Sequence, residues 1–226
     1  MKSTSRSYIL YGGIALSACI VILTVLKYLY LWTEPLPEKF LVNADETERQ
    51  FFYHFYNWFW EARPGFLLHI IPGGIALAVG PLQFLKRSSS SWFYLHEIPG
   101  YIYFISVFLS SSGGMSIALD AMGGAVARTG FFTASLLWMG TLLASGYFLF
   151  MQNYSSHSVW MKINFSLTFA AVTLRLEQPL LNVLGFDTIT AYQIVSWVSW
   201  LPNLIFAFAY TNPFAVHFLK KQKEGI

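Results

Sequence analysis

Two histidines, His96 and His157, stand where they could ligate a haem iron or another metal. Each begins a long apolar stretch, and basic residues nearby put both starts on the same side of a membrane. Two imidazoles held at similar depth by neighbouring helices can bind a haem iron axially, or share a metal with a third ligand. We therefore predict His96 and His157 as cofactor ligands, with b-type haem as the candidate cofactor. Interfacial hydrogen bonding is the alternative role for both.

His157 also begins a polar stripe along one apolar stretch, 157–184. Helical spacing places Asn164, Thr168 and Arg175 on the same face as His157. His157 and Arg175 are separated by about 27 Å at 1.5 Å per residue, nearly the thickness of the hydrocarbon core of a bilayer. Ionisable groups are costly in lipid, so we expect this face to turn toward protein or a cavity.

The permanent charge of Arg175 predicts a second site, toward the outer side of the membrane. Glu177 points to another side of the same helix, so Asp120 is the nearest candidate counter-charge by depth. We predict a ligand pocket lined by His69, Arg175 and Asp120, suited to an anionic or quinone-like molecule. A purely structural salt bridge of Arg175, or contacts to backbone carbonyls, is the alternative.

The sequence lacks the residues that several other kinds of metal site and enzyme require. A single cysteine, Cys19, excludes an internal disulfide and any multi-thiolate metal site within one chain. No nucleophile elbow, HExxH, P-loop or dinucleotide-binding glycine motif is present, so hydrolase, kinase and dehydrogenase chemistry of the soluble type is unsupported. The apolar run continues after Cys19, so we predict an unmodified core cysteine in an uncleaved segment.

Composition identifies a membrane protein. Of the 226 residues, 55% are hydrophobic and 11% charged, whereas soluble domains have roughly 25% charged residues. The net charge of +3 arises from short basic patches at the ends of apolar stretches. Such patches set orientation in a bilayer, so we predict no nucleic-acid partner.

Six apolar stretches must position the candidate residues. Transmembrane helices are predicted over 8–32, 66–85, 96–119, 129–150, 157–184 and 189–210. An aromatic-dense segment over about 47–62 is predicted as an interfacial amphipathic helix on the outer surface. The expected fold class is all-α: a polytopic membrane helical bundle of six transmembrane helices plus this interfacial helix, in a single membrane domain over 1–226.

The basic residues assign the sides of the membrane. Lys2, Arg6, Lys86, Arg87 and the lysines of 220–223 fall on one side, and the acidic loop 33–50 falls on the other. Positive charge marks the cytoplasmic side. Both termini are therefore predicted in the cytoplasm.

Four segments together resemble a known family. They are LLHIIPGGIALAVGPLQFL, HEIPGYIYFISV, HSVWMKINFSLTFAAVTLRLEQPLL and AYQIVSWVSWLPNLI, which span roughly 66–205. The pattern resembles the bacterial integral membrane family catalogued as domain of unknown function 2306, and His69, His96, His157 and Arg175 fall at its motif positions. The resemblance implies a multi-pass protein of the bacterial inner membrane and carries no particular activity with it.

Several function classes stay open at this point. One is a haem-b or quinone-linked redox role, with a quinone or another apolar small molecule as partner beside the lipid bilayer. The alternatives are a non-enzymatic membrane assembly or interaction partner and a small-molecule transporter. A transporter is expected to show paired broken helices, and only the Pro- and Gly-rich stretch 66–85 hints at one.

Overall fold

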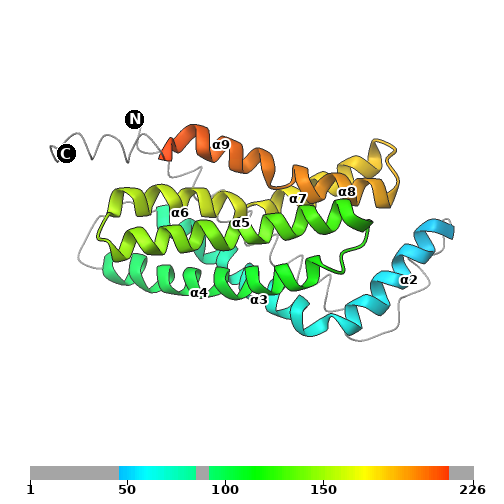
Figure 1. Cartoon of the computed structure of the whole chain (residues 1–226), viewed down its shortest axis with the longest axis horizontal. Helices are drawn as coiled ribbons and strands as arrows, with labels where there is room; N and C mark the ends of the chain where they lie inside the picture. The colour runs from blue at the N-terminus through cyan, green and yellow to red at the C-terminus, as the bar shows by residue number, and fades with distance from the viewer. Residues whose placement is uncertain (1–45, 85–91, 214–226) are drawn as a thin grey trace. The chain divides into compact units, whose positions relative to one another are not determined.

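The computed structural model describes residues 46–84 and 92–213, and every regular element in these two ranges is helical (Figure 1). In chain order the elements are α2 (Glu46–Glu61), α3 (Arg63–Val79), the 3₁₀-helix η3 (Gly80–Phe84), α4 (Trp92–Ala118), α5 (Gly124–Phe150), α6 (Tyr154–Thr168), α7 (Ala170–Val183), α8 (Thr188–Val198) and α9 (Leu201–Thr211). The all-α class is confirmed for this part of the chain. The predicted span 8–32, Cys19 and the basic residues used to assign the sides lie outside the described residues.

Within the described residues, four helical segments are long and apolar enough to cross a membrane: Arg63–Phe84, His96–Ala118, Gly124–Phe150 and Thr188–Thr211. They match the predicted spans 66–85, 96–119, 129–150 and 189–210. The predicted span 157–184 is not in this set. Its polar residues make it less apolar than the other four, and its helix is divided into α6 and α7. Six transmembrane helices are therefore not confirmed.

The helix α5 starts five residues earlier than predicted. The predicted span begins at 129, after the charged Arg128, but the helix begins at Gly124. Arg128 is exposed while Ala127 and Gly130 are buried, so the charged side chain points outward from a helical turn. Gly123 (φ 86°) and Gly124 (φ 68°) make the preceding turn in the left-handed region.

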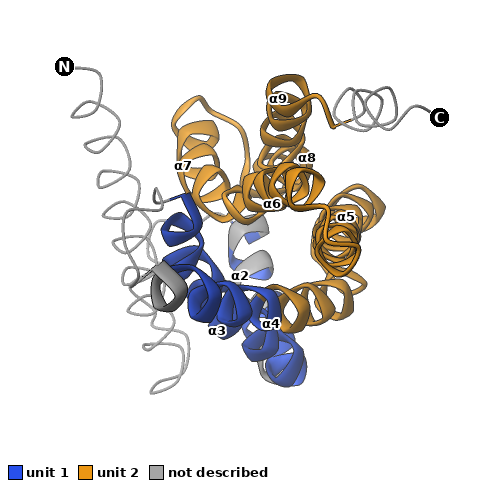
Figure 2. Cartoon of the chain, turned by 90° about the vertical axis from the view of Figure 1, so that its left-hand side faces the viewer, with its two compact units in different colours: residues 1–106 blue, residues 107–226 orange. Residues whose placement is uncertain are grey.

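The chain divides into two compact units, Met1–Ser106 and Val107–Ile226, and α4 runs from the first into the second (Figure 2). In unit 1, the helices α2 and α3 meet where Trp58 packs edge-on against Phe66, with ring centroids 6.1 Å apart. Pro64 occupies the first turn of α3, where its missing N–H is not needed.

Unit 2 is built around α5. The helix α6 packs antiparallel on the C-terminal half of α5, and α8 packs parallel to its N-terminal half. The helix α9 packs on α6, and α7 packs on α8 (Figure 1). The neighbour of α5 thus changes from α6 to α8 midway along its length.

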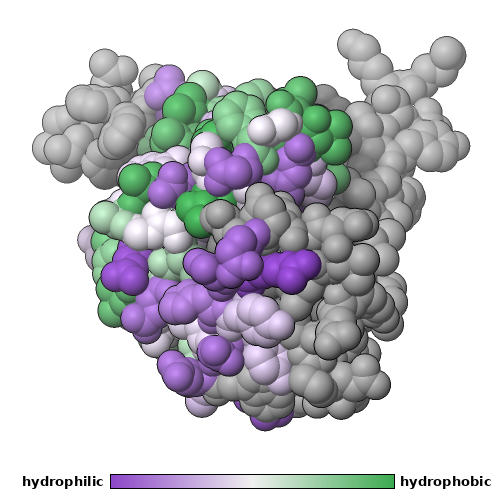
Figure 3. All heavy atoms as spheres, turned by 90° about the vertical axis from the view of Figure 1, so that its right-hand side faces the viewer, coloured by the Kyte–Doolittle hydropathy of each residue, from purple (hydrophilic) through white to green (hydrophobic). Residues whose placement is uncertain are grey.

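The turn between α7 and α8 in unit 2 is charged, and hydrophilic residues gather on the face of the molecule that Figure 3 shows. Asp187 begins α8 there, and its carboxylate accepts hydrogen bonds from the backbone N–H groups of Ile189 (3.1 Å) and Thr190 (3.0 Å). The hydrogen bonds with the side chain and backbone of Thr190 hold the pKa of Asp187 below its usual range. Charged and capped turns of this kind suit the aqueous boundary of a membrane protein.

Candidate functional site

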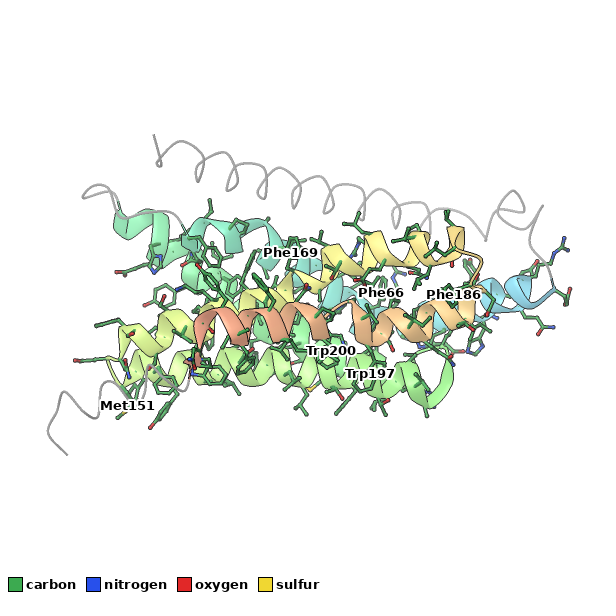
Figure 4. All side chains as sticks on the ribbon, turned by 90° about the horizontal axis from the view of Figure 1, so that it is seen from above. Phe66, Met151, Phe169, Phe186, Trp197 and Trp200 are labelled. Atoms are coloured by element: carbon green, nitrogen blue, oxygen red, sulfur yellow. The ribbon has the colours of Figure 1, made fainter. Side chains whose placement is uncertain are left out.

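Two breaks in the helices lie inside unit 2. One, at Phe169, separates α6 from α7, and the other, at Ser199 and Trp200, separates α8 from α9. Figure 4 shows Phe169 and Trp200 between Met151, at the α5–α6 turn, and Phe186, at the α7–α8 turn. The breaks therefore lie along the length of the bundle and not at its ends.

A proline explains the second break. Pro202 occupies the first turn of α9 and has no N–H to continue the hydrogen bonds of α8. Next to the break, the carbonyl of Ser196 accepts a hydrogen bond from a side chain, the indole Nε1 of Trp200, at 2.7 Å. Interrupted helices persist in membranes where side chains satisfy the backbone groups that the interruption releases.

Polar side chains join the two breaks. The hydroxyl of Thr173, in the first turns of α7, donates a hydrogen bond to the carbonyl of Ser199. The side-chain amide of Asn203, in α9, donates to the same carbonyl at 3.0 Å and to the Thr173 hydroxyl at 3.2 Å. We call Thr173, Ser199 and Asn203 the break triad. It ties α7 to the junction of α8 and α9.

A second polar network joins α5 to α6. The Asn164 side chain is fully buried and donates to the Trp138 carbonyl (2.7 Å) and to the Thr141 hydroxyl (2.8 Å). The Trp138 indole donates to the Thr168 hydroxyl at 2.9 Å. This part of the polar stripe therefore turns toward protein, as the sequence predicts.

His157 lies at the start of α6, half-buried against α5. Its Nδ1 atom is 2.9 Å from the Ser145 hydroxyl oxygen and 3.0 Å from the Ser145 carbonyl oxygen. A carbonyl can only accept, so Nδ1 carries a proton, and in the neutral imidazole the lone pair is then on Nε2. Among the described residues, none forms a hydrogen bond with Nε2. Metal-binding histidines commonly have this arrangement, in which a second partner orients the ring.

The surroundings of His96, near the start of α4, include a residue that the sequence did not predict. The Gln83 side-chain amide, in η3, donates to the His96 carbonyl at 3.2 Å. Its Oε1 lies 3.4 Å from the position that a Cβ on Gly100 would occupy. The space beside Gly100 therefore holds Gln83. His96 belongs to unit 1 and His157 to unit 2, so their pairing on one haem stays a prediction.

The residues of the predicted outer pocket are distributed over three elements. Arg175 is half-buried in α7, and its Nη1 donates to the Ala171 carbonyl at 2.6 Å. Asp120 is exposed in the α4–α5 turn, and His69 is half-buried in α3 of unit 1. The pocket stays a prediction. Within the described part of the chain, no group of three or more His, Cys, Asp or Glu side chains could hold a metal ion.

Sequence reasoning missed the break triad. Its members are neutral and are common in membrane helices for other reasons, so residue type alone gave no signal. The available signal was Pro202 in the middle of an apolar stretch, with Asn203 next to it. A proline at that place predicts an interrupted helix, and interruptions mark binding sites in many transporters.

A family model described as a predicted membrane protein, DUF2306, matches residues 66–211. The chain belongs to this family. The match extends from α3 to the end of α9 in this DUF2306 protein and so includes His69, His96, His157 and Arg175, together with both helix breaks. No curated protein and no solved structure matches the chain.

Proposed function

We propose that this membrane protein spans the bacterial inner membrane six times, with both termini in the cytoplasm and α2 at the outer interface. The four candidate spans support it, as do the basic patches of the sequence. The stretch α6–α7 supplies the fifth span in this proposal, because two of its polar residues, Asn164 and Thr168, are buried against protein. The sixth is 8–32.

Reporter fusions test this topology. A cytoplasm-active reporter fused after Ile226 is expected to be active, and the same reporter inserted within 43–48 is expected to be silent. A reporter that works only outside the cytoplasm should give the opposite pattern. Activity of that second reporter at Ile226 would refute the cytoplasmic C-terminus.

We further propose a redox role in which His96 and His157 ligate one b-type haem at the cytoplasmic side. The observation that carries it is the orientation of His157, because the Ser145 carbonyl fixes the proton on Nδ1 and leaves Nε2 for a ligand. Haem would supply one-electron chemistry. His96 and His157 would hold this group, and the Ser145 carbonyl would orient the His157 ring, with a quinone as the apolar partner.

An absorption spectrum tests the haem proposal. Protein purified in detergent from haem-replete cells is expected to show a Soret band that disappears in His96→Ala and in His157→Ala. Ser145→Gly removes only the hydroxyl contact and keeps the backbone carbonyl, so this variant should retain the band. Colourless wild-type protein would refute haem binding.

A ligand pocket lined by His69, Arg175 and Asp120 is the second part of the proposal. The half-buried guanidinium of Arg175 supports an anionic or quinone-like ligand. In a Cys19→Ser background, cysteines at positions 69 and 175 are expected to crosslink with a short bifunctional reagent. A pair at 69 and 183 serves as the control, because Val183 ends α7 on its exposed side. Equal crosslinking of both pairs would argue against the pocket.

A small-molecule transporter is the alternative function, and the paired helix breaks favour it. Two interrupted helices joined by the break triad resemble the arrangement expected around transporter binding sites. Purification with and without crosslinking separates the classes. Bound cofactor favours the redox role, a stoichiometric partner protein favours an assembly role, and colourless protein without a partner favours transport.

A further inference from the structure

Glu177 is an acidic residue in the middle of α7, and one oxygen of its carboxyl group, Oε2, has no hydrogen-bond partner. The side chain is half-buried, and its Oε2 atom is enclosed by protein without any hydrogen bond to it. No ion pair of Glu177 is present among the described residues. Buried polar atoms in native proteins are nearly always hydrogen-bonded, so an unpartnered carboxyl oxygen requires an explanation.

The nearest charge along the helix does not supply a partner. Arg175 precedes Glu177 by two residues, which corresponds to a rotation of about 200° around a helix, and its Nη1 donates to the Ala171 carbonyl on its own helix. The two side chains therefore leave α7 in different directions. Glu177 is also six residues from the end of α7 at Val183, roughly 9 Å along the helix axis at 1.5 Å per residue.

An isolated carboxylate is unstable in such a place. Enclosing part of an ionised carboxyl without a cation or hydrogen-bond donors removes hydration from the charged form and so favours the protonated form. Ionisable residues inside membrane segments are rare, and in pumps and transporters they form proton pathways. We propose that Glu177 is a proton-binding site that is protonated at neutral pH. The proposal rests on the membrane location of α7 and is independent of haem.

A protonated carboxyl in an apolar environment reacts with hydrophobic carbodiimides. Its O–H adds across one C=N bond of the reagent, so that a C–O bond forms and the proton moves to nitrogen. The acyl group of this O-acylisourea then shifts from oxygen to nitrogen and gives a stable N-acylurea. No atom is lost and nothing is oxidised or reduced, so the modified residue gains the full mass of the carbodiimide.

The experiment uses the full chain in native membranes at neutral pH. After treatment with dicyclohexylcarbodiimide, peptide mass spectrometry is expected to find the adduct on Glu177 and to find Glu97 and Asp187 unmodified. These two acidic residues are exposed and serve as internal controls. The comparison within one wild-type chain does not require any variant to fold. Equal labelling of the three residues would overturn the proposal.

Infrared spectroscopy gives an independent measurement. The wild-type protein should show the carbonyl band of a protonated carboxylic acid, which is absent in Glu177→Gln and present in Glu97→Gln. If the two measurements disagree, the infrared band is decisive. A band without an adduct supports the proposal, because the site then holds a proton but excludes the reagent. An adduct without a band overturns the proposal. Absence of both also overturns it. Absence of haem affects neither measurement, so failure of the redox proposal is distinguishable.

Discussion

Replacement of Gly130 by alanine is expected to lower the free energy of unfolding by about 1–3 kcal/mol, the usual range for overpacking. A Cβ at this position would lie 2.6 Å from the Ser196 hydroxyl oxygen, 2.7 Å from the Ser196 carbonyl oxygen and 2.9 Å from the Trp197 indole nitrogen. The carbonyl belongs to the backbone of α8, and the Trp197 indole already donates to the Val126 carbonyl at 3.1 Å. The helix α8 must therefore move away from α5.

Gly140→Ala is the matched control, because Gly140 lies in the same helix and a Cβ there would have nothing within 4 Å. This change should raise stability by about 0.5–1 kcal/mol, since alanine loses less backbone freedom on folding than glycine does. Thermal unfolding of the two detergent-purified variants measures the change in stability that each substitution causes. Similar shifts in the two variants would show that α5 and α8 are not in close contact at Gly130.

Replacement of Asn164 by alanine is expected to lower the free energy of unfolding by about 1–3 kcal/mol, because it removes buried hydrogen bonds between α5 and α6. The Asn164 amide donates to the Trp138 carbonyl and to the Thr141 hydroxyl, and the site is closed to solvent. Loss of this side chain also leaves a small cavity between the helices. The lost hydrogen bonds and the cavity both lower the free energy of unfolding.

Ser166→Ala is the control for the Asn164 variant. The Ser166 hydroxyl donates only to the Ile163 carbonyl of its own helix, at 2.7 Å, so its loss should change stability by less than about 0.5 kcal/mol. A double-mutant cycle of Asn164→Ala with Thr141→Val should give a coupling energy near 0.6 kcal/mol, the average for hydrogen bonds between membrane helices. Zero coupling would contradict the contact between these two side chains.

The sequence by itself determined the class of protein and most of the spans. Long apolar stretches predict helices in a bilayer because only internal hydrogen bonding satisfies the backbone there. Helical spacing also placed Asn164 and Thr168 on one face, and both are buried. These features depend on residues within one or two helical turns, and four matching segments of the chain were enough to indicate the family that the comparison then established.

The tertiary structure alone decided where the helices break and what joins them. Thr173 and Ser199 are 26 residues apart, and Gly130 and Ser196 are 66 apart. No local pattern indicates that the Thr173 hydroxyl reaches the Ser199 carbonyl, because threonine can equally bond within its own helix. The choice depends on which backbone groups lack a partner once the helices are packed, and in a low-dielectric interior a carbonyl released at a break must find a donor from whichever helix lies beside it.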